Sequence, residues 1–215
     1  AMGYWINAGM QSSATLNVIA DGHVSILTGS PDIGGSRASM ALMASEVLGI
    51  PFEQIHPQVA ATDAVGHTDV TGGSRTTLAT GQAVIQAAEE CVAEMCRRAA
   101  AEWELEPGVV TWSQGAAHYG DQSLTFEDLA GRAGAMGGPL TFSTSLTSTS
   151  TAPGFGVHIC DAEVDKETGR TIITRYTAIQ DAGKAIHPDY VEGQMQGGAV
   201  QGIGWALNEE YVYNE

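Results

Sequence analysis

Charged residues, and basic ones above all, are scarce in this sequence. Only 16% of its 215 residues are charged, and 9 basic residues against 25 acidic ones leave a net charge of −16. Such a chain repels the phosphates of nucleic acids and of anionic membranes, which argues against nucleic-acid binding. Because about 25% of the residues in an ordinary soluble domain are charged, we expect another body, such as the rest of a larger subunit, to cover much of this surface.

Cysteines, long apolar runs and metal-binding motifs are also scarce. The three cysteines, Cys91, Cys96 and Cys160, have no repeated spacing, which argues against a disulfide framework and agrees with a reducing compartment. No apolar run approaches the roughly 18–20 residues of a membrane span, and no signal-peptide pattern opens the chain, so we expect a cytoplasmic setting. The motifs HExxH, CxxC and His-x-His are absent, so the sequence offers no obvious set of protein ligands for a metal.

Apolar residues and glycine are plentiful. Hydrophobic residues make up 43% of the chain, enough to bury a core and to exclude wholesale disorder. The 27 glycines are about twice the usual share of roughly 7%, which indicates turns that bring the backbone close to another body. No shift in composition marks a hinge, so we treat 1–215 as one region and, if it divides, expect two subdomains near 1–150 and 151–215.

The periodicity of the apolar residues predicts an α+β fold of hairpin-plus-helix halves, with mixed sheets packed by helices. Alternating apolar and polar residues predict β-hairpins over 14–29 and 156–181. Apolar residues at spacings of three and four predict a helix that ends at Gly49 and further helices over 81–103 and 188–208.

Weaker patterns predict the shorter elements. Residues 54–60 are expected to form a proline-containing strand, and 107–124 two short strands. Thr125, with Asp128 three residues later, predicts a small helix with a capping-box-like start. The Ser/Thr-rich run 140–154 fits either an extended strand or a crossing loop, and we favour the loop for its second half.

Two glycine-rich turns precede predicted helices, PDIGGSR at 31–37 and TGGSRTT at 71–77. A turn of this kind leaves backbone N–H groups unpaired at the positive end of the helix dipole, which is an anion-binding arrangement. The alternative is an ordinary tight turn, with Ser36 as the helix N-cap in the first case. The presence of two such turns, each followed by Ser-Arg, makes the ordinary turn a less satisfactory explanation of the pair.

A third glycine-rich segment, VEGQMQGGAVQGIG, spans 191–204. Its glycines lie among good helix formers, although each costs a helix interior about 1 kcal/mol relative to alanine. Close approach is therefore needed to explain them. Either a neighbouring helix packs against them, or a ligand lies along them while Gln194 and Gln201 present their amides from one face.

Four segments resemble a known family when they are taken together. They are LTGSPDIGGSRASMALMASEVLGIP, TDAVGHTDVTGGSRTTLATGQAV, AEVDKETG and HPDYVEGQMQGGAVQGIGWALNEE. In this order they resemble the molybdenum-binding large subunit of the xanthine dehydrogenase, aldehyde oxidase and carbon monoxide dehydrogenase family. The resemblance covers nearly the whole chain, and its most specific parts are GGSRTTLATGQAV and GQMQGGAVQGIG.

The resemblance implies a molybdopterin-binding region whose metal is held by the dithiolene of the pterin, with no protein side chain as a ligand. It implies iron–sulfur and flavin (FAD) partners, and oxidation of a heteroaromatic, an aldehyde or a related substrate, or of carbon monoxide. It leaves open whether the cofactor is molybdopterin or its dinucleotide form. The residues that it implies to face the pterin and its phosphate or dinucleotide tail are Gly34, Gly35, Gly73, Ser74, Arg75, Thr76 and Gln194.

Two departures from the family pattern limit what the resemblance implies. Many members have a Gly-Gln-Gly turn where this chain has Gly34-Gly35-Ser36, so only backbone contact is expected there. The family's catalytic base is a glutamate in a Gly-x-Gly-Glu-like element downstream of the GQ segment, and neither Glu209 nor Glu210 matches it. We therefore expect an internal piece of a subunit several times longer, inactive by itself.

Two other functions remain open on the sequence alone. One is a non-catalytic α+β binding or scaffold domain from a truncated gene. The other is a generic phosphate-binding domain that uses the two Gly-Ser-Arg turns.

Overall fold

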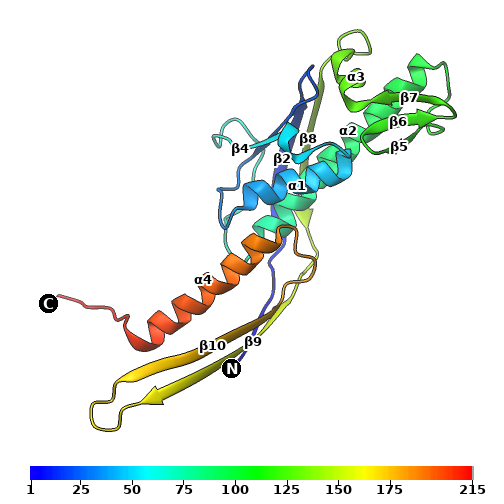
Figure 1. Ribbon diagram of the computed structural model, residues 1–215. Helices are drawn as coiled ribbons and strands as arrows, with labels where there is room; N and C mark the ends of the chain where they lie inside the picture. The colour runs from blue at the N-terminus through cyan, green and yellow to red at the C-terminus, as the bar shows by residue number, and fades with distance from the viewer. Residues whose placement is uncertain (215) are drawn as a thin grey trace. The chain divides into compact units, whose positions relative to one another are not determined.

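The computed structural model describes residues 1–214, which form two compact units (Figure 1). The larger unit is Ala8–Thr151, and the smaller one combines Ala1–Asn7 with the chain from Ala152 onward. Both units contain sheets packed by helices, which confirms the predicted α+β class. No helix in the described part of the chain is long and apolar enough to cross a membrane.

The larger unit is built on a four-stranded sheet with the strand order β4-β3-β2-β8. The first predicted hairpin is present as β2 (Met10–Val18) and β3 (Val24–Thr28). On one side β8 (Leu140–Ser148) runs antiparallel to β2, and on the other β4 (Ile55–Val59) runs parallel to β3. Pro57 lies in this edge strand, where its missing N–H interrupts no interior ladder.

Two helices, α1 (Ser36–Leu48) and α2 (Gly81–Glu102), pack against this sheet and against each other (Figure 1). The two helices approach closely at Gly81, where an added Cβ atom would lie 2.6 Å from the sulfur of Met43. The left-handed Gly49 ends α1 as predicted, with φ 71°. The core is made largely by a stripe of small apolar residues on α2, namely Ala83, Val84, Ala87, Ala88, Cys91, Met95 and Ala99.

A second, smaller sheet of the larger unit contains three short antiparallel strands, β5 (Thr111–Ser113), β6 (Ala116–Tyr119) and β7 (Gln122–Thr125). The sequence predicted only two strands here. The third was missed because only Gly120 and Asp121 separate β6 from β7. The helix α3 (Phe126–Gly131) follows, and it begins with the predicted capping box between Thr125 and Asp128.

The smaller unit contains a three-stranded antiparallel sheet, β1 (Met2–Trp5), β9 (Gly154–Val164) and β10 (Thr171–Asp181), in the order β1-β9-β10. The β9–β10 hairpin was predicted, whereas β1 was not. The Ser/Thr-rich run 140–154 forms strand β8 as far as Ser148, and its second half contains a loop over 149–153 before β9 begins. The predicted last helix is α4 (Pro188–Leu207), and the side chain of His187 caps its first turn.

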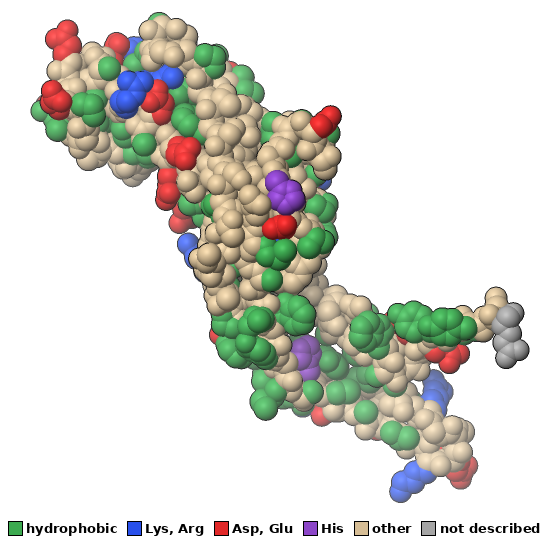
Figure 2. Space-filling model, turned by 180° about the vertical axis from the view of Figure 1, so that it is seen from behind, with side chains coloured by type: hydrophobic (Ala, Val, Ile, Leu, Met, Phe, Trp, Pro, Cys, Tyr) green, Lys and Arg blue, Asp and Glu red, His purple; other side chains and the backbone are tan. Residues whose placement is uncertain are grey.

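Large hydrophobic side chains of the smaller unit reach the surface in groups. Figure 2 shows hydrophobic side chains gathered on the viewed face, where lysines and arginines are few. The exposed hydrophobic residues of the smaller unit come from both its sheet and helix α4. They include Tyr4, Trp5, Phe155, Ile159, Ile179, Val200 and Trp205. Extended apolar surface of this kind is typical of an interaction face.

A charge cluster on α2 makes the stability of the larger unit depend on pH in the acid range. The carboxylate of Glu94 accepts a hydrogen bond from Nε of Arg97 (2.6 Å) and another from Nε of Arg98 (2.7 Å). These two arginines, Arg97 foremost, lower the pKa of Glu94 from 4.5 to about 2. Arg98 is buried and also donates to the carbonyls of Ala133 and Gly138, so Glu94 neutralises a buried charge.

Because the pKa of Glu94 is lower in the folded chain than in the unfolded one, its stabilisation is complete above pH 4.5 and is lost as the pH falls towards 2. We expect Glu94→Gln to lower the free energy of unfolding by about 1–2 kcal/mol at pH 7 and to match the wild type near pH 2. Urea unfolding at several pH values measures this difference. The exposed Glu89→Gln is the control, and a pH profile of Glu94→Gln parallel to that of the wild type would contradict the prediction.

Candidate functional site

Gly34 and Gly35 form a tight turn immediately before α1. Their φ angles are 58° and 75°, and the N–H of Ser36 donates to the carbonyl of Ile33 (3.1 Å). Two consecutive left-handed residues closed by this bond make a type I′ turn, which favours glycine at both central positions. Gly35 is the N-cap, so Ser36 is not. No acceptor among residues 1–214 pairs with the N–H of either glycine, and we call these two N–H groups open; Gly34 is exposed and Gly35 is half-buried.

The first turn of α1 itself does not offer the open donors that the sequence suggested. The carboxylate of Asp32 accepts from the backbone N–H of Arg37 (3.1 Å) and from its Nε (2.8 Å). The backbone bond, followed by the side-chain bond, lowers the pKa of Asp32. The carbonyl of Gly35 accepts from the N–H groups of Ala38 and Ser39. Asp32 already supplies a negative charge here, so the N–H groups of Gly34 and Gly35 are the donors at this helix start that have no acceptor among the described residues.

The second turn has left-handed residues at corresponding places, Gly73 with φ 66° and Ser74 with φ 58°. The carbonyl of Gly73 accepts from the N–H of Ala8 (3.4 Å). A left-handed serine is a strained residue of the kind that clusters at functional sites. The buried Thr76 then opens a π-helical turn, Thr76–Thr80, that leads into α2. Such turns are also frequent at functional sites.

Arg75 is turned into the protein. It is fully buried, and its guanidinium donates to acceptors of the protein itself: the carbonyls of Gly9 (2.9 Å), Asp69 (3.0 Å) and Gln11, and the hydroxyl of Ser12 (2.6 Å). Burial lowers the pKa of Arg75, and the charge of Asp69 opposes this effect. Because an arginine remains protonated even so, Arg75 is a charged anchor that holds the turn. Four of its five N–H groups are engaged in this way, and the side chain is fully buried, so direct bonding to an anion would require it to move.

Loop 66–75 lies beside the first residues of β2, because β2 is longer than β3 and extends past its end. Strand β8 pairs with the whole of β2, but β3 pairs only with Ala14–Val18. The loop satisfies the backbone groups that remain on that side. Gln11 donates its N–H to the carboxylate of Asp69 (2.8 Å), and the N–H of Asp69 donates to the carbonyl of Gln11 (3.0 Å). Backbone groups must be paired, so the loop replaces the missing strand.

Gln194 belongs to the smaller unit, on α4. One face of α4 lies towards β10 and lines a pocket of about 340 Å³ with apolar residues that include Met195, Ala199 and Ile203. At 3.6 residues per turn, Gln194 and Gln201 lie on the opposite face. Both are exposed, and a Cβ atom at Gly197 or Gly198 between them would meet nothing within 4 Å. Within residues 1–214, therefore, no neighbouring helix packs against these glycines.

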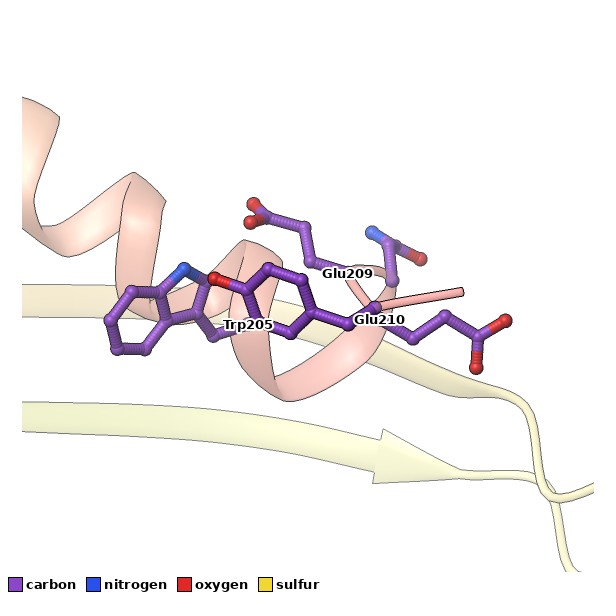
Figure 3. A pocket seen from close by; sticks show the side chains of 5 residues that line it. Trp205, Glu209 and Glu210 are labelled. Carbon is purple, nitrogen blue, oxygen red and sulfur yellow. The ribbon is translucent and has the colours of Figure 1, made fainter. Parts of the chain in front are cut away.

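A further pocket, of about 470 Å³, lies at the end of α4, and its lining includes Glu209 and Glu210 (Figure 3). The two carboxylates point in different directions in Figure 3, so they do not form an acid–base pair. Glu209 instead lies against Gly204, whose added Cβ would collide with its carboxylate. No three His, Cys, Asp or Glu side chains of the described residues are placed to hold a metal ion.

Comparison with known proteins identifies the family of this chain. Its residues 1–215 match the family model described as a molybdopterin cofactor-binding domain. The chain belongs to this family. It is 31% identical over 207 residues to the xanthine dehydrogenase of Drosophila subobscura, covering 95% of this chain and 15% of that enzyme. It is 29% identical over 214 residues to the nicotine 6-hydroxylase large subunit of Paenarthrobacter nicotinovorans, covering 94% of this chain and 26% of that subunit.

The fold comparison agrees with the family. The carbon monoxide dehydrogenase from Oligotropha carboxidovorans superposes with a TM-score of 0.88 at 23% identity, over 99% of this chain and 30% of the other. The family model confirms the predicted resemblance and cofactor class. The chain spans only a minor part of the length of these relatives. The larger unit fits a phosphate-bearing cofactor, because the N–H groups of Gly34 and Gly35 are open.

Proposed function

We propose that the two glycine turns bind the phosphate of molybdopterin, or of its dinucleotide form, through backbone N–H groups. The observation that carries the proposal is the pair of open N–H groups at Gly34 and Gly35 in a member of this family. Successive backbone N–H groups in such turns form anion-binding concavities. They need no lysine, which suits a chain with a net charge of −16.

We assign each predicted residue a role within its own unit. Gly34, Gly35 and Gly73 present backbone, and Ser74 and Thr76 add hydroxyl donors. Arg75 acts through the loop that it holds. In the smaller unit, Gln194 orients the pterin with its amide, as the open face of α4 permits. When bound, the cofactor supplies the redox chemistry of molybdenum, while these residues bind it and fix its orientation.

We further propose that the chain works inside a molybdenum hydroxylase. Its substrate would be a heteroaromatic, an aldehyde or a related compound, or carbon monoxide, and electrons would pass to iron–sulfur and flavin partners in the cytoplasm. The relatives are longer than this chain, and the exposed apolar faces of the smaller unit support coverage by the rest of a large subunit. By itself the chain is expected to be inactive.

Gln194→Ala is expected to reduce bound molybdopterin and activity by about tenfold, because one hydrogen bond to a ligand contributes roughly 1–3 kcal/mol. The variant is made in the full-length subunit in cells that supply the cofactor, and pterin and molybdenum are measured per subunit. The control is Gln196→Ala on the same helix. Gln196 lines the pocket beside β10 and bonds to Glu192 (3.1 Å), so its loss should leave cofactor content unchanged.

Unchanged cofactor content and activity in Gln194→Ala would contradict the role assigned to this amide. Wild-type protein that is free of molybdenum despite a cofactor supply, and that associates through its apolar faces, would instead favour the non-catalytic scaffold domain.

A further inference from the structure

A continuous chain of buried hydrogen bonds runs through the larger unit. It leads from the guanidinium of Arg75 to the hydroxyl of Ser12 (2.6 Å), from there to Thr80 (3.1 Å), and finally to Ser30 (2.9 Å). Arg75, Ser12 and Thr80 are 0% exposed and Ser30 is 4% exposed. The chain therefore has no competition from water, and its members depend on one another for partners.

Arg75 fixes only the first bond of this chain: a guanidinium only donates, so the hydroxyl of Ser12 accepts from it. The bonds from Ser12 to Thr80 and from Thr80 to Ser30 can each run in either direction, because a hydroxyl both donates and accepts. No ion pair within residues 1–214 includes Arg75. Its positive charge is therefore balanced by oxygen dipoles together with the nearby charge of Asp69, and hydrogen bonds in such chains polarise one another.

The two ends of the chain lie at the two glycine turns. Arg75 directly follows Gly73 and Ser74, and Ser30 directly precedes the loop that carries Gly34 and Gly35. Thr80 stands between them as the last residue of the π-helical turn before α2. The two turns are far apart in sequence, and this chain is a physical connection between them.

We propose that Arg75, Ser12, Thr80 and Ser30 are positioning residues that couple the two glycine turns. Loss of any link weakens the others and loosens both turns, including the turn at the far end. The inference deepens the proposed function, because a cofactor that contacts both turns needs them held at a fixed spacing. The coupling itself is measurable without any cofactor.

Hydrogen exchange of the full chain tests the coupling at amides whose hydrogen bonds hold each loop in place. Ser36 and Arg37 report on the first turn, and Gln11 and Asp69 on the second. Ser30→Ala removes only the last hydroxyl, yet it is expected to speed exchange at the distant Gln11 and Asp69 by about threefold or more. A merely local structural role would leave those amides unchanged.

Variants at Thr80 test the centre of the chain. Thr80→Val keeps the side-chain shape and removes the hydroxyl, so exchange at both turns should rise by about tenfold, whereas Thr80→Ser should behave like the wild type. The matched control is Thr144→Val, because the buried hydroxyl of Thr144 has no partner among the described residues. It should accelerate neither turn.

The proposal is overturned if Ser30→Ala affects only Ser36 and Arg37, if Thr80→Ser exchanges as fast as Thr80→Val, or if Thr144→Val loosens both turns equally. Should Thr80→Val fail to fold, Ser30→Ala and Thr80→Ser decide the question. Molybdopterin content of the same variants tests the proposed function separately: accelerated exchange with full cofactor content supports the coupling and counts against cofactor binding by these turns.

Discussion

Replacement of Arg75 by methionine is expected to lower the free energy of unfolding by about 4 kcal/mol or more. Methionine keeps the aliphatic stem of arginine but has no donors, so the carbonyls of Gly9 and Asp69 would lose the guanidinium, while the carbonyl of Gln11 would keep only the N–H of Asp69 and the hydroxyl of Ser12 only Thr80. Each acceptor left unpaired costs roughly 1–3 kcal/mol. The affected acceptors are the carbonyls of Gly9, Gln11 and Asp69 and the hydroxyl of Ser12. Because these groups tie β2 to loop 66–75, we expect the larger unit to lose much of its stability.

Urea unfolding measures this effect, with Arg37→Met as the control. Arg37 is a surface arginine bonded to Asp32 (2.8 Å), and such a pair contributes at most about 1 kcal/mol. Arg75→Lys should fall between the two, since an ammonium keeps the charge but cannot reach the same fork of acceptors. If Arg75→Met were no less stable than Arg37→Met, the buried hydrogen bonds would not be what holds the loop.

The fold was predictable wherever a segment carries its own structural information. The β2–β3 hairpin and the end of α1 at Gly49 follow from local alternation and turn chemistry. The missed strands, β1 and β7, are four residues each and have little pattern of their own. Strand β1 forms only because β9, about 150 residues later in the chain, offers it a pairing edge. Such pairing depends on tertiary structure, which short-range periodicity does not contain.

The site was predictable in the same uneven way. The glycine turn at Gly34 and Gly35 has a sequence signature because left-handed residues favour glycine. The orientation of Arg75 has none, because two of its acceptors, the carbonyls of Gly9 and Gln11, come over 60 residues earlier in the chain. Asp32 was overlooked as the partner of the helix start, although an acidic residue just before a helix N-terminus is a recognisable signal. The serine and threonine hydroxyls that join the loops follow no periodicity.

Gly35→Ala is expected to remove about nine-tenths of the bound molybdopterin while costing only about 1 kcal/mol of stability. The φ of 75° at Gly35 strains an alanine modestly. A Cβ atom beside the open N–H groups would obstruct an anion, and strain would tend to open the turn that presents them. Cofactor content per subunit and urea unfolding, both in the full-length protein, separate the two effects.

Gly120→Ala is the matched control, since it introduces the same kind of strain at a place without a proposed contact. Gly120 has φ 56° in the turn between β6 and β7, and a Cβ atom there would meet nothing within 4 Å. Gly35→Asn adds a second comparison, because asparagine tolerates the left-handed conformation and should keep near-native stability while its amide crowds the anion. If Gly35→Ala and Gly35→Asn both retain as much molybdopterin as Gly120→Ala, the N–H groups of this turn do not bind the cofactor.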